Sequence, residues 1–169
     1  MLPAALQDPD PVIIFEHVSL YNMEGSLPEL GGPVDLARAQ VRRPGSDVSL
    51  ITYGGSLSKA MSAAEKLDRQ GISAEVLDLR MLRPLDTEAI IASVTATHRV
   101  VIVDEGWRSV GISAEIAARI AEKAIWELDA PIARVCSKEV PVPYAQHLEQ
   151  AATPQVADIV TAARTLTGR

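Results

Sequence analysis

The stretch that decides the fold is RVVIVDEGWRSVGISAEIAARI, residues 99–120. It opens with an apolar, β-branched run that predicts a strand over 99–105. A short loop follows, and apolar residues then recur at helical spacing from about 113 to 128. This order predicts a β-strand joined to an α-helix, with the loop DEGWRSVG at the carboxyl end of the strand.

Similar strand and helix patterns lie on both sides of this unit. They alternate along the chain, which predicts a mostly parallel sheet covered by helices on both faces. The fold class is therefore α/β, a three-layer α/β/α domain over about 47–169. The other predicted strands are 47–54, 72–79 and 132–137, and the other predicted helices are 56–71, 87–97, 147–151 and 154–166.

Residues of the types that cap helices occupy the predicted helix ends. Ser56 is expected as an N-cap, and Gly71 fits the position just past the same helix. Asp86 is expected to cap the helix that begins at residue 87. His98 is expected to cap the carboxyl end of that helix.

The first part of the chain follows another pattern. Residues 2–7 resemble the tail of a helix, and VIIFEHV at 12–18 is apolar enough to predict a strand. A single strand is not stable alone, so a larger body is expected to precede residues 1–18, whether the sequence is a fragment, its start is misplaced or the two halves are separate chains. Glycine and proline are frequent in 19–46, which predicts a linker.

Composition limits the possible functions. The 169 residues are 47% hydrophobic and 22% charged, so a packed core is expected, and the net charge of −6 argues against general nucleic-acid binding. No apolar run approaches the length of a membrane span, and the N-terminus lacks the pattern of a signal peptide, so a cytoplasmic location is expected. The single cysteine, Cys136, excludes a disulfide within the chain and a site of several thiolates.

Three segments, 79–84, 104–111 and 136–144, are expected at the carboxyl edge of the sheet, where ligands of open α/β sheets collect. The loop 104–111 has three alternative interpretations. It lacks both nucleotide-binding glycine motifs, so a plain connection is favoured over a phosphate cradle. A protein interface is the third alternative, because the indole of Trp107 is a typical interface anchor.

The polar residues near this edge do not form a recognisable catalytic motif. Asp104 and Glu105 are adjacent on a strand and should point to opposite faces, so turn and cap roles are favoured over an acid/base pair. Arg80 and Arg83 could hold an anion, but ion pairing with Asp78, Asp86 or the 104–105 acids is favoured. His17, His98 and His147 lack metal-ligand spacing, and Cys136 is expected to be an inert buried thiol.

Eight segments, in this order, resemble the carboxyl-terminal half of the beta subunit of the pyruvate dehydrogenase decarboxylating component. Beta subunits of the acetoin and branched-chain 2-oxo acid dehydrogenases are similar, and the wider superfamily is that of the transketolase carboxyl-terminal domain. The segments are PVIIFEH (11–17), LITYG (50–54), VLDLRMLRPLD (76–86), VVIVDEGW (100–107), AEIAARI (114–120), LDAPIARV (128–135), VPVPYA (140–145) and PQV (154–156).

The resemblance implies that residues 1–18 end a thiamine pyrimidine-binding domain, that 19–46 is a linker and that 47–169 is a transketolase carboxyl-terminal-like domain. It also implies oxidative decarboxylation of a 2-oxo acid by the intact enzyme, with pyruvate as the favoured substrate. Thiamine diphosphate and Mg²⁺ would be held by the alpha subunit, and the glutamate that activates thiamine would lie in the missing half. No catalytic, cofactor-binding or metal residue is therefore assigned in this chain, which is expected to be inactive alone.

The implied partners are an alpha subunit, a second beta subunit and the subunit-binding domain of the acyltransferase. Asp129 matches an acid that pairs with a basic residue of that domain, although a turn acid before Pro131 is an equal alternative. The tail ends in Arg169, a positive charge that departs from the family pattern. Trp107 completes the candidate partner-binding set. Two other functions stay open: a free-standing anion or nucleotide-binding module, and the carboxyl-terminal domain of a transketolase or deoxyxylulose-phosphate synthase.

Overall fold

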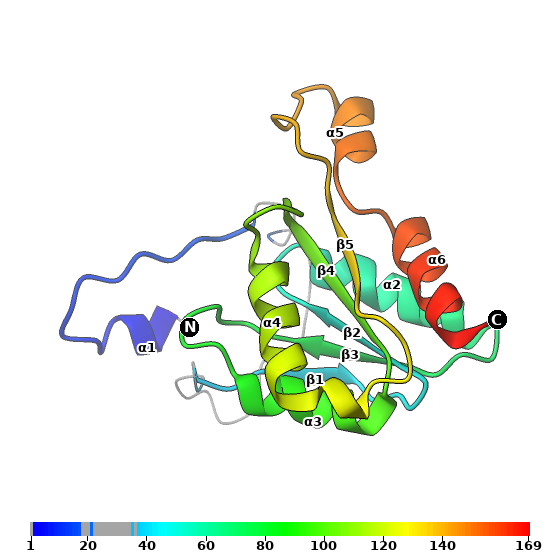
Figure 1. The fold of residues 1–169 in the computed structure, drawn as a ribbon. Helices are drawn as coiled ribbons and strands as arrows, with labels where there is room; N and C mark the ends of the chain where they lie inside the picture. The colour runs from blue at the N-terminus through cyan, green and yellow to red at the C-terminus, as the bar shows by residue number, and fades with distance from the viewer. Residues whose placement is uncertain (1, 18–20, 22–34, 36) are drawn as a thin grey trace.

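The computed structural model describes residues 2–17, 21, 35 and 37–169. Its centre is a five-stranded sheet with the order β1-β3-β2-β4-β5 (Figure 1). Four neighbouring strands run parallel, and β1 pairs antiparallel with β3 at one edge. The strands are β1 (Gln40–Arg43), β2 (Val48–Thr52), β3 (Ala74–Asp78), β4 (Val100–Trp107) and β5 (Ala133–Ser137).

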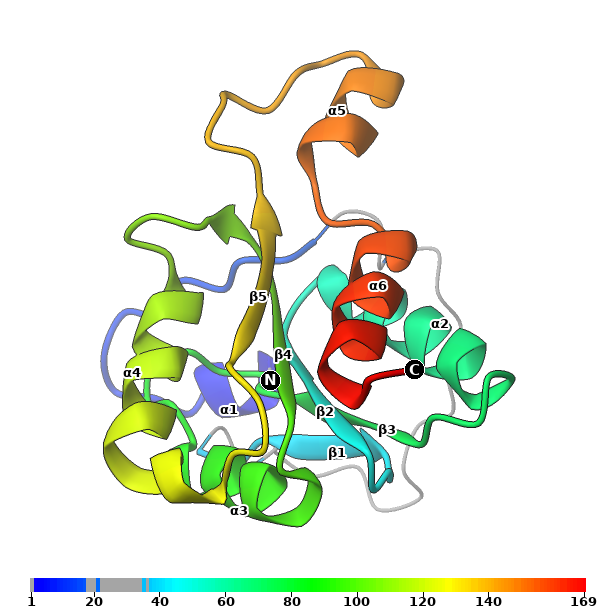
Figure 2. The ribbon, with the colours of Figure 1, turned by 45° about the vertical axis from the view of Figure 1, so that its right-hand side comes forward.

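Helices cover both faces of the sheet, which confirms the predicted three-layer α/β/α fold. One core cluster joins the sheet to α2 and α6, and the other joins it to α3 and α4. Figure 2 shows these two pairs of helices on opposite sides of the strands. The helices are α1 (Leu2–Ala5), α2 (Ser56–Asp68), α3 (Thr87–Thr97), α4 (Ile112–Ala124), η2 (Ile125–Glu127), α5 (Gln146–Ala152) and α6 (Val156–Thr167).

Successive side chains of the central strands point to opposite faces of the sheet and so contribute to both hydrophobic cores. In β2, Val48 and Leu50 pack with α2 and α6, whereas Ile51 packs with α3 and α4. All five residues of β2 and of β3 are buried, because each face of these strands meets a helix. The apolar runs in the sequence therefore reflect strands covered on both sides.

Two predicted helix caps are confirmed, and one is wrong. The Asp86 carboxylate accepts a hydrogen bond of 3.0 Å from Ala89 N, and His98 ends α3 in the left-handed conformation with φ of 59°. Ser56, however, is the first residue of α2, and Gly55 holds the N-cap position. The Ser56 hydroxyl is buried and has no hydrogen-bond partner among the described residues.

Two predictions for the first 46 residues need correction. Residues 11–17 form no strand, since no other strand pairs with them, and Phe15 is 94% exposed. Within the predicted linker 19–46, Gln40–Arg43 forms β1, so the sheet begins before residue 47. Residues 18–20, 22–34 and 36 of that region lie outside the described residues. The division into a remnant, a linker and a main domain otherwise stays a prediction.

The helix predicted over 113–128 is also divided. Regular α4 ends at Ala124, and the 3₁₀ turn η2 follows. Ile125, which the helical pattern placed on the buried face, is therefore exposed, as is its neighbour Trp126. None of the helices in the described ranges is long and apolar enough to cross a membrane.

Candidate functional site

Asp104 organises the loop between β4 and α4. Its carboxylate is completely buried and accepts hydrogen bonds from Tyr53 Oη at 2.7 Å, Gly106 N at 2.7 Å and Ser113 N at 3.1 Å. Tyr53 directly follows β2, Gly106 lies near the end of β4, and Ser113 lies in the first turn of α4. The contacts confirm the turn and cap role that the sequence favoured for Asp104.

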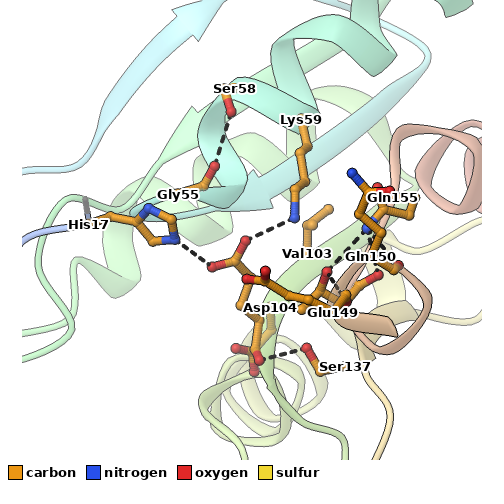
Figure 3. A network of polar contacts seen from close by, with 12 residues as sticks. His17, Gly55, Ser58, Lys59, Val103, Asp104, Ser137, Glu149, Gln150 and Gln155 are labelled. Carbon is orange, nitrogen blue, oxygen red and sulfur yellow. Dashed lines mark hydrogen bonds and ion pairs between the residues drawn. The ribbon is translucent and has the colours of Figure 1, made fainter. Parts of the chain in front are cut away.

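Glu105 points to the other side of β4. Its carboxylate lies 3.0 Å from Lys59 Nζ and 3.3 Å from His17 Nε2 (Figure 3). Lys59 belongs to α2, whereas His17 belongs to the amino-terminal segment that crosses this edge of the sheet. As expected, Asp104 and Glu105 diverge and do not form an acid/base pair.

Close backbone approach explains the two glycines of the loop. A Cβ atom at Gly111 would lie 2.2 Å from the Trp107 carbonyl oxygen, and one at Gly106 would lie 2.9 Å from Asp104 Oδ1. The Asp104 carboxylate also occupies the amino end of α4, where a phosphate cradle would need free N–H groups. The geometry supports a plain connection and gives no support to a phosphate cradle at this loop.

Asp129 and Arg169 both lie at the amino edge of the sheet, where the parallel strands begin. Asp129 precedes β5, and its carboxylate lies 2.9 Å from the Arg99 guanidinium, directly before β4. Its side chain remains 53% exposed. Arg169 donates to the Gly71 carbonyl at 2.6 Å and lies 3.8 Å from Asp47, which places the carboxyl terminus beside the starts of β2 and β3.

Trp107 lies at the opposite edge. It is the last residue of β4 and is 48% exposed. The structure therefore separates the three predicted partner-binding residues: Asp129 and Arg169 share the amino edge, and Trp107 is alone at the carboxyl edge. The pairing of Arg99 with Asp129 was not predicted from the sequence. The two residues are far apart in sequence and come together only because β4 and β5 begin side by side in the sheet.

Other predicted pairings differ in the structure. Asp78 pairs with Arg42 of β1 at 2.8 Å, and no salt bridge among the described residues involves Arg80 or Arg83, so the expected ion pairing of these two arginines is wrong. Cys136 is half-buried and lies 3.3 Å from Ser113 Oγ, which corrects the expectation of a buried thiol.

The described residues provide no metal site. No group of three or more histidine, cysteine or acidic side chains in this part of the chain could hold a metal ion. The acids at the carboxyl ends of β3 and β4, namely Asp78, Asp104 and Glu105, are already engaged by protein donors. The residues present do not fit the Mg²⁺ that accompanies thiamine diphosphate, and no catalytic step is assigned to them.

Comparison with known proteins identifies the family. The family model described as "Transketolase, C-terminal domain" matches residues 37–159. The chain belongs to this family. Its match begins just before β1, in agreement with a sheet that starts before residue 47.

The curated relatives of this transketolase C-terminal domain include beta subunits of pyruvate dehydrogenase and of an acetoin oxidoreductase. The chain is 43% identical over 173 residues to the mitochondrial pyruvate dehydrogenase E1 component subunit beta of Dictyostelium discoideum, covering 100% of this chain and 49% of that protein. It is 42% identical to the beta subunit of acetoin:2,6-dichlorophenolindophenol oxidoreductase of Cupriavidus necator, covering 97% of this chain and 48% of that one. The chain thus spans about half the length of these relatives.

A solved structure shares the arrangement of elements. The chain matches "Split gene transketolase, inactive beta4 tetramer" with a TM-score of 0.71 and 27% identity, covering 84% of this chain and 47% of that chain. This similarity agrees with the α/β/α architecture derived from the strand order.

Proposed function

We propose that this chain is the carboxyl-terminal part of the beta subunit of a thiamine-diphosphate-dependent 2-oxo acid dehydrogenase, with pyruvate as the preferred substrate class. One observation carries the proposal: the whole chain aligns at 43% identity with about half of a pyruvate dehydrogenase beta subunit. The reaction would oxidatively decarboxylate the 2-oxo acid, and thiamine would supply the carbanion chemistry. In this proposal, cofactor and Mg²⁺ are held outside this chain, by the alpha subunit.

The role proposed for this chain is assembly. An alpha subunit and a second beta subunit would cover surfaces that the isolated domain leaves open. Large apolar side chains that are almost fully exposed support this role, because their burial against a partner would stabilise association. The most exposed of them are Val110, Trp126 and Tyr144.

We further propose that the amino edge binds the subunit-binding domain of the acyltransferase. The Asp129 carboxylate is half-exposed and available to a basic residue of a partner. Arg99 already contacts it at 2.9 Å, so a basic partner must share or displace this pair. Arg169 is engaged with Gly71 and Asp47, which reduces its repulsion of a basic partner.

A cytoplasmic location remains a prediction.

Reconstitution tests the proposed enzyme. The purified chain with thiamine diphosphate, Mg²⁺ and pyruvate should show no decarboxylation. The same chain, mixed with the alpha subunit and the amino-terminal half of a beta subunit, should assemble and release carbon dioxide from pyruvate. Turnover by the chain alone, or failure to assemble with either component, would contradict the proposal.

A second candidate is one half of a transketolase. The match to a split-gene transketolase favours it, although the identity there is 27% and the identity to the pyruvate dehydrogenase beta subunit is 43%. Calorimetry with a purified subunit-binding domain of the acyltransferase separates the two candidates. Binding supports the dehydrogenase subunit, whereas its absence, together with activity on sugar phosphates after reconstitution, supports the transketolase.

A further inference from the structure

A basic hollow lies beside the edge strand β5. It has a volume of about 370 Å³ and is lined by Arg108, Arg134 and Lys138, by residues 151–154 and by Asp158. Figure 2 shows β5 at the edge of the sheet, with the connection from α5 to α6 beside it. The basic hollow therefore combines the β4–α4 loop, β5 and the start of α6 in one concave site.

The three cations of the basic hollow have no acidic partner. No carboxylate among the described residues lies within salt-bridge distance of Arg108, Arg134 or Lys138, whereas Arg42 and Arg99 are paired. The one acid in the lining, Asp158, accepts a hydrogen bond of 2.9 Å from Gln155 N in the capping box of α6. Three cations and one carboxylate leave a formal surplus of two positive charges in a chain whose net charge is −6.

The two guanidinium groups are held in place before any ligand arrives. Arg108 Nη1 donates to the Arg134 carbonyl at 2.9 Å, and Arg134 Nη1 donates to the Arg108 carbonyl at 3.1 Å. The other nitrogens of both groups have no protein partner in the described part of the chain. Such preorganisation reduces the entropy lost on binding.

A second link fixes the same loop. The Ser109 hydroxyl and backbone N–H donate to Glu139 at 2.5 and 3.0 Å, and these bonds lower the pKa of the Glu139 carboxyl. Glu139 therefore stays ionised at neutral pH and is used to anchor the loop. Its carboxylate forms no salt bridge with Arg108, Arg134 or Lys138.

We propose that the basic hollow binds a small phosphomonoester through Arg108, Arg134 and Lys138. A phosphomonoester carries between one and a half and two negative charges near neutral pH, which matches the surplus, and arginine binds phosphate through paired N–H groups. The hollow has the volume of a small-molecule site, at about 300–1,000 Å³. Val135, Ala151, Ala152 and Pro154 offer apolar surface to the organic part of the ester.

This site is separate from the proposed acyltransferase surface. Asp129 precedes β5, and Lys138 follows it, so the two surfaces lie at opposite ends of the strand. The proposal does not rest on the proposed function, and either can fail without the other. A bound phosphomonoester would contact the carboxyl end of β5.

Nuclear magnetic resonance titration of the full chain tests the proposal. The probes are glycerol 3-phosphate, adenosine monophosphate, inorganic phosphate, succinate and tetraglutamate at constant ionic strength. Backbone signals of Ala133–Ser137 should shift with the two esters, less with inorganic phosphate, and least with succinate, because only the esters combine a near-dianionic phosphoryl group with an organic part. The signal of Asp129 should stay unchanged.

Two test variants and one control variant extend the titration. Arg134→Gln and Lys138→Gln should each weaken ester binding about tenfold, since each removes a charged hydrogen-bond donor. Lys138 donates no side-chain hydrogen bond to the described residues, so its variant tests the site even if Arg134→Gln disturbs β5. Lys66→Gln, at an exposed cation in the last turn of α2, should bind like the original chain.

Three results would overturn the proposal. The first is the absence of shifts with either ester, and the second is equal binding by the chain and by Lys138→Gln. The third is a response only to an acidic peptide such as tetraglutamate. That response would make the basic hollow a contact site for an acidic protein segment.

Discussion

Tyr53 donates a hydrogen bond of 2.7 Å to the completely buried carboxylate of Asp104. This bond joins the residue after β2 to β4, and the same carboxylate reaches the first turn of α4 through Ser113 N. A buried carboxylate is costly unless donors satisfy it. Asp104 has three, so the loop that follows β4 is held from the interior of the domain and needs no ligand.

Replacing Tyr53 with phenylalanine removes one of these donors. Because a hydrogen bond to a charged group contributes about 1.5–3 kcal/mol, Tyr53→Phe should lower the free energy of unfolding by that amount. Urea unfolding followed by circular dichroism measures the change. Tyr144→Phe is the matched control, since Tyr144 is 104% exposed and should change stability little. Equal stability of the two variants would show that the Asp104 contact contributes nothing.

The same tyrosine should make stability depend on alkaline pH. Burial, the hydrogen bond to Asp104 and the nearby negative charges raise the pKa of Tyr53 above its usual value of 10.0. A group whose pKa is raised by folding stabilises the folded state fully below its unfolded pKa and loses that contribution as pH rises. The stability difference between the chain and Tyr53→Phe should therefore shrink above pH 10. A difference that is constant or grows there contradicts this assignment.

Gly111 should tolerate no side chain. Its φ of −76° suits any residue, but a Cβ atom would lie 2.2 Å from the Trp107 carbonyl oxygen. Gly111→Ala should destabilise the domain by about 1–3 kcal/mol, because a backbone group must move. Gly71→Ala provides a comparison with a different cause: nothing lies within 4 Å, but φ is +74°, so only the left-handed backbone is penalised. Thermal unfolding of both variants measures the costs, and an unchanged Gly111→Ala would contradict the close approach.

Local signals predicted the parts of this fold that local physics determines. Asp86 and His98 were correctly predicted as caps, because a cap interacts with the backbone of the adjacent helix turn and its preference can be read from the local sequence. β1 was missed because Gln40–Arg43 has no apolar alternation and exists through pairing with β3 and the Arg42–Asp78 contact. An edge strand stabilised by distant partners leaves little trace in its own sequence.

The candidate site was predicted less completely, for a related reason. Trp107 and Asp129 were grouped as partner-binding residues, yet they lie at opposite edges of the sheet, one at the end of β4 and one before β5. The basic hollow was missed altogether. Arg108 and Arg134 are far apart in sequence and meet only because β4 and β5 are parallel neighbours.

The amino edge gives a direct test of partner binding. Asp129→Lys should weaken binding of the acyltransferase subunit-binding domain by about 2 kcal/mol or more, because it places a positive charge against a basic partner. Glu115→Lys is the matched control: Glu115 is also a half-exposed acid paired with an arginine, Arg119 at 2.7 Å, but it lies in the first turn of α4, at the opposite end of the sheet. Calorimetry should show weaker binding for Asp129→Lys alone. If Arg99 competes with the partner for Asp129, Arg99→Gln should bind more tightly than the original chain. Unchanged affinity in both amino-edge variants would remove Asp129 from the docking surface and leave it as the acid of a local ion pair.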